Sequence, residues 1–290
     1  MTIDAVLAHG DVPPAPSAAD GLTAWTFDPV VWVALALVAW LYGRAVRRVA
    51  GWPRRRSWCA AGGLATLFVA TSGPPAVYEG ALFWVHMVQH LLLTLVAAPF
   101  LAFAAPVALA LRAAGPRSRG VLVRLVHARF VRVLAHPLVG WVAFAVVMWA
   151  THFSGLYDAA LEDELVHAFE HSLYLGAALL FWAPVAGVDP VPRVSRPVRV
   201  AYLLAAIPVQ SFLGLAVYSA DAPLYDHYAT LDRGAAYPSL LDDQQLAGGV
   251  MWIGGDVLLL AWAGIAAAAW LRAEEREGVR IDRREKAPPP

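Results

Sequence analysis

Seven long apolar segments take up most of the chain, and they fix the class of protein that it can form. They run over 29–49, 58–76, 81–103, 136–154, 162–184, 199–219 and 244–270. Each is close to the roughly 20 residues that a helix needs to cross a bilayer core of about 30 Å. Lipid cannot satisfy free backbone groups, so segments of this kind cross a membrane as helices. The sequence therefore predicts an all-α, polytopic membrane protein with seven transmembrane helices.

The composition agrees with this prediction and excludes other classes of protein. Hydrophobic residues make up 59% of the 290 residues and charged residues 15%, whereas soluble domains average about 25% charged residues. The 22 basic and 22 acidic residues give a net charge of zero, which argues against a nucleic-acid partner. The single cysteine, Cys59, excludes an internal disulfide. The expected surroundings are therefore the lipid bilayer.

Basic residues fall almost entirely on one side of the predicted spans. The loops after the first, third and fifth segments and the C-terminal tail hold 21 of the 22 Lys and Arg residues, and only Arg233 falls on the other side. Because basic loops stay in the cytoplasm, we expect the N-terminus outside and the C-terminus inside, in a cytoplasmic membrane. The expected parts are an exposed N-terminal tail (1–28), a seven-helix transmembrane domain (29–272) and a cytoplasmic tail (273–290).

Five of the nine histidines fall at one depth, near the outer ends of their segments. They are His86, His90, His152, His167 and His171. Residues four apart are neighbours on a helix, so His86 and His90 share a face, as do His167 and His171. Both pairs follow the pattern Val-His-x-x-[Gln/Glu]-His-x-Leu. Ionisable groups inside spans are expensive and mark functional sites, so we expect these rings to face the bundle interior.

Imidazoles gathered in this way suit copper, zinc, iron or nickel. No thiolate is expected at this depth, because Cys59 falls at the cytoplasmic end of its segment, and Met87 offers a soft thioether beside His86. Copper is therefore favoured over zinc as the bound metal. Hydrogen bonds between helices are the alternative role for the histidines.

Four further side chains are expected to orient the ligating rings without binding the metal themselves. They are Met87, Glu170, Tyr174 and Asp256. Glu170 and Tyr174 share a polar stripe with His167 and His171, and carboxylates commonly orient ligating imidazoles. Asp256 falls about midway through the last segment, and its role stays open between function and structure.

Two other classes of function compete with a copper-binding protein. A membrane-embedded zinc hydrolase would use three histidines and a water, with Glu170 or Asp256 as the base. A b-type haem or quinone protein would use paired histidines from two helices. We find no recognised hydrolase arrangement of Ser or Asp beside the histidines, so the favoured prediction is a protein that is not an enzyme.

Three blocks of sequence carry these residues. They read HMVQHLLL at 86–93 with AP at 98–99; HF at 152–153 with LYDAAL at 156–161 and HAFEH at 167–171; and DQQLAG at 243–248 with MW at 251–252 and GD at 255–256. These blocks resemble the CtaG-type cytochrome c oxidase assembly factors, a seven-helix membrane family of Gram-positive and related bacteria. The resemblance spans about residues 25–270.

The resemblance implies an assembly factor that presents or delivers copper at the outer side of the membrane. Its implied partners are a subunit of a haem-copper oxidase and an extracytoplasmic copper chaperone. The candidate ligands carried over from it are the five histidines named above.

Overall fold

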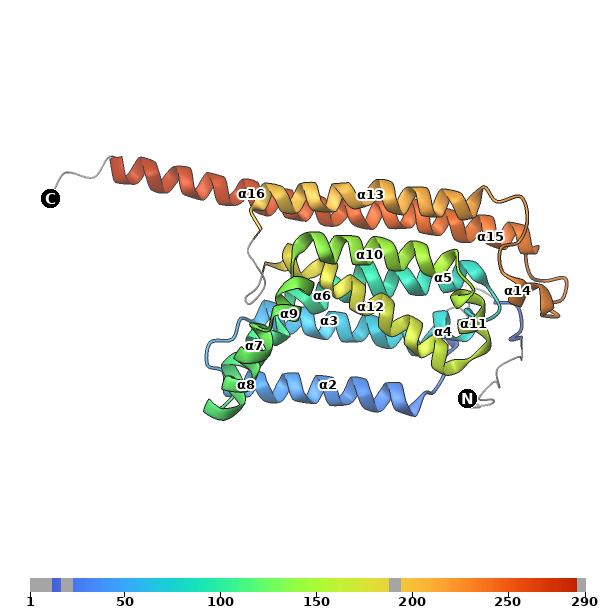
Figure 1. Cartoon of the computed structure of the whole chain (residues 1–290), viewed down its shortest axis with the longest axis horizontal. Coiled ribbons are helices and arrows are strands. Elements are labelled where there is room, and N and C mark those ends of the chain that lie inside the picture. The colour runs from blue at the N-terminus through green and yellow to red at the C-terminus, as the bar shows by residue number, and fades with distance from the viewer. Residues whose placement is uncertain (1–11, 17–22, 188–193, 286–290) are drawn as a thin grey trace.

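The computed structural model describes residues 12–16, 23–187 and 194–285, and the regular structure within these ranges is helical. Long helices run side by side along the longest axis, with α13 (Arg196–Tyr218) and α16 (Gly255–Glu285) on one flank and α2 (Pro29–Arg48) on the other (Figure 1). The predicted all-α class is confirmed.

Each of the seven predicted segments coincides with a helix or a continuous helical run. Besides α2 and α13 these are α3 (Arg54–Ser72); α5 (Phe83–Leu91), η1 (Leu92–Ala97) and α6 (Ala98–Phe103); α10 (Pro137–His152); α12 (Glu164–Ala186); and α15 (Leu240–Gly249), η2 (Val250–Gly254) and α16. The shorter connecting helices are α4 (Pro74–Tyr78), α7 (Pro106–Ala113), α8 (Pro116–Val126), α9 (Arg129–Leu134), α11 (Leu156–Glu162) and α14 (Asp226–Thr230). In Figure 1, α4, α11 and α14 gather at one end of the bundle and α7, α8 and α9 at the other.

Fewer than seven of these helices qualify as membrane spans by length and composition. Four described stretches do so: α2, Phe83–Ala113, α13 and Leu240–Arg280. A fifth results if α10 and α11, which meet at a bend of 69°, form one span. Several long apolar helices therefore mark a multi-pass membrane protein, as predicted. The count of seven and its orientation are not established by the helices and stay a prediction.

Polar residues explain why two of the predicted spans do not qualify. α3 and α12 are long enough, at 19 and 23 residues. However, α3 opens on three consecutive arginines, 54–56, and the N-terminal half of α12 carries His167, Glu170 and His171. The side chains that could form a buried site are thus the ones that reduce the apolar character of α12.

The predicted tails are only partly described. Residues 1–11, 17–22 and 286–290 of the two tails, and residues 188–193 of the fifth loop, lie outside the described residues. Pro13 is buried, and its carbonyl accepts a hydrogen bond of 2.5 Å from the Tyr237 hydroxyl. α16 continues to Glu285 and projects past the other helices (Figure 1), so the expected tail from residue 273 begins as a helix.

A carboxylate distant in sequence fixes the start of α5. The Asp243 carboxylate accepts hydrogen bonds from the backbone N–H groups of Phe83, at 3.2 Å, and Trp84, at 3.1 Å. These are among the first N–H groups of a helix, which have no partner within the helix itself. Arg233 donates to the same carboxylate at 2.7 Å. Arg233, the one basic residue predicted on the outer side, therefore serves to neutralise a buried acid.

Two π-helical stretches interrupt the runs that contain α5 and α16. Such stretches often lie at functional sites, and η1 follows α5 within two residues of His90. Indole N–H groups donate to carbonyls of η1, from Trp182 to Thr94 at 2.8 Å and from Trp262 to Leu95 at 2.9 Å. These bonds attach the wider turns to α12 and α16, so they help to hold the three helices in register.

Glycines allow α13 and α15 to touch through their backbones. A Cβ atom added to Gly248 would lie 2.7 Å from the carbonyl oxygen of Gly214, and one added to Gly214 would lie 2.8 Å from that of Gly248. Contacts this short leave no room for a side chain. Small residues at such crossings are typical of helix association in membranes.

Replacing Asp243 with Asn should lower the free energy of unfolding by about 3 kcal/mol, because Arg233 would be left as a nearly buried charge without its partner. The side chains of Arg233 and Asp243 are 7% and 2% exposed. The measurement is circular dichroism during titration of dodecyl sulfate into the detergent-solubilised protein. The matched control is the exposed neighbour Asp242→Asn, which should cost less than about 1 kcal/mol. Equal losses for the two variants would contradict this role for Asp243.

Candidate metal centre

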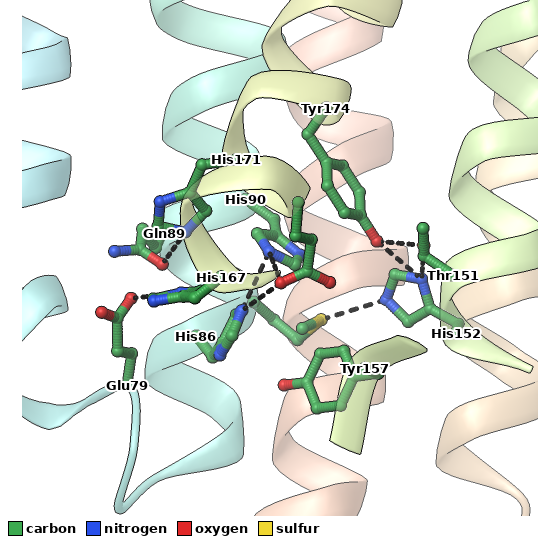
Figure 2. A network of polar contacts seen from close by, with 12 residues as sticks. Glu79, His86, Gln89, His90, Thr151, His152, Tyr157, His167, His171 and Tyr174 are labelled. Atoms are coloured by element: carbon green, nitrogen blue, oxygen red, sulfur yellow. Dashed lines mark hydrogen bonds and ion pairs between the residues drawn. The ribbon is translucent and has the colours of Figure 1, made fainter. Parts of the chain in front are cut away.

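The five histidines predicted from the sequence lie close together, on α5, α10 and α12. Figure 2 shows the rings of His86, His90, His167 and His171 turned toward one another, with His152 to one side. Their ring centroids confirm this arrangement: His86 lies 5.5 Å from His167, and His90 lies 6.1 Å from His171 and 6.2 Å from His152. His86, His90 and His152 are buried, as expected, whereas His167 and His171 are partly buried.

Glu170 completes the tightest group of donor atoms. The Nε2 atoms of His86 and His90 are 2.9 Å apart, and Glu170 Oε2 lies 3.8 Å from the first and 3.9 Å from the second. Donor atoms about 3–4 Å apart fit around one ion with bonds of about 2 Å. The sequence led us to expect Glu170 behind a ligating ring. Its carboxylate instead faces the same volume as the two imidazoles.

Several atoms of this group are buried without hydrogen bonds to the described residues. They are both carboxylate oxygens of Glu170 and the Nδ1 atoms of His86 and His90. Leaving a buried donor or acceptor unpaired costs about 1–3 kcal/mol, and more for a charged group. A cation bound between Glu170 and the two Nε2 atoms would satisfy the carboxylate. The residues present therefore fit a metal ion.

A second group of donors overlaps the first. His86, His167 and His171 each offer a nitrogen, and these three atoms lie within 4.8 Å of one another. Behind them, Glu79 Oε2 lies 3.7 Å from His167 Nε2, and Gln89 Oε1 lies 2.9 Å from His171 Nε2. Gln89 also donates to the carbonyl of Ala70 on α3 at 2.9 Å. Gln89 thus links His171 to α3, and Glu79 lies beside His167.

The repeated sequence pattern has a direct structural counterpart. Gln89 and Glu170 occupy the same place in the pattern Val-His-x-x-[Gln/Glu]-His-x-Leu. Gln89 on α5 contacts His171 on α12, and Glu170 on α12 faces His86 and His90 on α5. Each helix therefore supplies a polar group to the histidines of the other.

His152 is oriented by its neighbours and lies beside the two groups rather than within them. Its Nδ1 atom lies 2.7 Å from the Met148 carbonyl, and its Nε2 atom lies 3.4 Å from the sulfur of Met87. A ring that donates through Nδ1 keeps the lone pair on Nε2 available for a metal. Met87, predicted to support a ligand, contacts His152 rather than His86.

Tyr174, expected to support the ligating rings, contacts two of the histidines. Its ring stacks on that of His90 at 4.1 Å between centroids, and its hydroxyl contacts Thr151 and lies 3.2 Å from His152 Nδ1. Asp256 is not brought into the centre. It accepts a hydrogen bond from Ser211 on α13, with oxygen distances of 2.8 and 2.9 Å.

Three residues of the centre were not predicted from the sequence. Gln89 could have been found from its place in the repeated pattern. Glu79 lies in the loop before α5, and burial raises the pKa of its carboxyl well above the usual range, with Glu170 nearby adding to the shift. Tyr157 on α11 is fully buried, with its ring 4.9 Å from that of His86. Neither Glu79 nor Tyr157 belongs to the repeated pattern, so the spacing of the histidines did not indicate them.

The chain matches the family model described as cytochrome c oxidase caa3 assembly factor (Caa3_CtaG) over residues 36–273. Similar proteins include Mb0105 of Mycobacterium bovis and MT0111 of Mycobacterium tuberculosis, each 30% identical over 290 residues, and ML1998 of Mycobacterium leprae, 28% identical over 287 residues. All three are described as uncharacterized. These alignments cover 94% of this chain but 43% of each relative, so the chain spans less than half their length.

No solved structure matches the chain. The family match includes all five histidines as well as Glu79, Gln89 and Glu170, and it confirms the resemblance inferred from the three sequence blocks. This protein belongs to the cytochrome c oxidase caa3 assembly factor family.

Proposed function

We propose that this assembly factor binds copper among His86, His90, Glu170, His167 and His171 and presents it at the outer side of the membrane to a haem-copper oxidase during assembly. The observation that carries this proposal is the Glu170 carboxylate, which faces two buried imidazoles and lacks hydrogen bonds to the described residues. Four imidazoles and a carboxylate form a binding set for a cation, and the family's description supplies the oxidase.

The donor types support copper over zinc. Imidazole binds either metal, and at a given nitrogen or oxygen site Cu²⁺ is generally held more tightly than Zn²⁺. The thioether of Met87 next to His152 adds a soft donor within reach of the centre, of the kind that Cu⁺ accepts. His152 completes the proposed set as a ligand that the ion could use together with Met87.

The proposed topology has seven spans, with the N-terminus outside and the C-terminus in the cytoplasm of a bacterium. The basic residues support this orientation, because all but Arg233 fall on the expected cytoplasmic side. The centre then lies near the outer surface, beside the end of the bundle where α4, α11 and α14 gather (Figure 1). Acidic outer loops would favour the approach of cations.

The proposed role is transfer of metal rather than catalysis. Partners on this reading are an oxidase subunit that receives copper and an extracytoplasmic copper chaperone that supplies it. A transfer protein requires ligands that can exchange, and the centre holds more donors than the three or four that one copper ion requires.

A topology test follows from the proposed orientation. Alkaline phosphatase, which is active only outside the cytoplasm, should be inactive when fused after Pro290 and active when inserted after Asp221. Green fluorescent protein at the same two positions should give the opposite pattern. An active phosphatase after Pro290 would contradict the topology.

A binding test follows from the proposed ligands. The double variant His86→Gln/His90→Gln should lose more than about 100-fold in copper affinity, because even residues that only orient a metal ligand contribute about 10- to 100-fold. The measurement is competition with a copper chelator in detergent. The matched control is His127→Gln/His136→Gln, at the other end of the bundle, which should bind as the unchanged protein does. Full copper binding by the first variant would place the site elsewhere.

A cellular test addresses the oxidase. Deleting the gene should lower the copper content and activity of the haem-copper oxidase under copper limitation, and added copper should restore part of both. Oxidase copper is measured on purified membranes, and activity as oxygen consumption with reduced cytochrome c. A deletion strain with full oxidase copper and activity under limitation would exclude copper delivery.

A further inference from the structure

The two groups of donor atoms share one residue. His86, His167 and His171 form one group, and His86, His90 and Glu170 form the other. His86 offers a ring nitrogen to both groups. Its Nε2 atom lies 2.9 Å from His90 Nε2 and 3.8 Å from Glu170 Oε2. The centre is therefore better described as two overlapping positions than as one ring of five ligands.

Shared use of His86 prevents full occupation of both positions by separate ions. A neutral imidazole has one nitrogen lone pair that can bind a metal, because its other nitrogen carries the proton. An ion held by His86 with His167 and His171 thus takes away the donor that the other position needs. The two positions are alternatives for one ion.

The positions differ in their access to the outside. The His167 and Glu79 side chains are 16% and 14% exposed, whereas those of His86 and Glu170 are fully buried. Figure 2 places His167 and Glu79 together on one side of His86, where the loop before α5 begins. The group that contains His167 is therefore the outer position, and the group that contains Glu170 is the inner position.

The positions also differ in charge. The outer position consists of three imidazoles, which bind a metal as uncharged ligands, whereas the inner position includes a carboxylate. In a buried site an opposite charge compensates the ion, and an uncompensated ion is expensive. A metal cation should therefore be held more tightly at the inner position, which also has the buried and otherwise unsatisfied oxygens of Glu170.

We infer that a single copper ion enters past Glu79 to the outer three-histidine position and then moves to the inner position at Glu170, with His86 remaining bound throughout. This inference rests on the proposed copper-binding function. Each move exchanges some ligands while at least one stays attached, so the ion is not released into the apolar interior. The outer position serves for transit and the inner position for storage.

Substitutions that remove one position at a time test this path. The probe is Cu²⁺ buffered with a chelator, and the readouts are ions per chain, affinity and the electron paramagnetic resonance spectrum. The unchanged protein should bind one ion. Glu170→Gln should still bind one ion, with lower affinity and a spectrum of nitrogen donors only. His167→Gln/His171→Gln should keep the original spectrum and affinity but load more slowly in stopped-flow mixing.

His86→Gln is the decisive variant, because it should lose both positions and bind no copper at concentrations that fill the other two variants. Unfolding in dodecyl sulfate checks that each variant is folded, and Glu170→Asp should keep the spectrum of the inner position. Two ions per unchanged chain, or loss of all copper in both Glu170→Gln and His167→Gln/His171→Gln, would overturn the two-position path alone. No copper on the unchanged protein would overturn both this path and the proposed function.

Discussion

The buried carboxylate of Glu170 is the constraint around which the centre is arranged. Its oxygens have no hydrogen bonds to the described residues, and His86 and His90 approach it at 3.8 and 3.9 Å. Neutral imidazoles do not cancel its charge, and an isolated ion in an apolar interior is strongly disfavoured. A cation bound there would compensate the carboxylate and accept lone pairs from the rings. The acid and the histidines are thus complementary parts of one site.

Contacts far from the centre keep its two main helices in place. Asp243 holds the start of α5 through two backbone N–H groups, and Trp182 of α12 donates to a carbonyl of η1, three residues past the end of α5. The close approach of Gly214 and Gly248 brings α13 against α15, which carries Asp243. The third sequence block therefore contributes structure to the centre without supplying a ligand to either donor group.

Spacing along the sequence was sufficient to predict which histidines share a helix face. It was not sufficient to predict which residues meet between helices. Residues four apart share a helix face whatever the tertiary structure, so the pairing of His86 with His90 and of His167 with His171 followed from the sequence. The position of Glu170 depends on how α12 is rotated against α5, which only their mutual contacts determine. Glu79 comes from a loop, and Asp256 pairs with Ser211 because of the crossing of α13 and α16. The count of seven spans stays a prediction for a related reason: the polar residues of the centre lie within α12 and lower its apolar character.

The identity of the metal is the most direct test of this account. The protein should be purified in detergent without added metal or chelator, and its metal content and optical spectrum measured on one sample. We expect copper, at up to one ion per chain, and no Soret band. Zinc as the bound metal, or a Soret band from haem, would contradict the central claim that this centre handles copper.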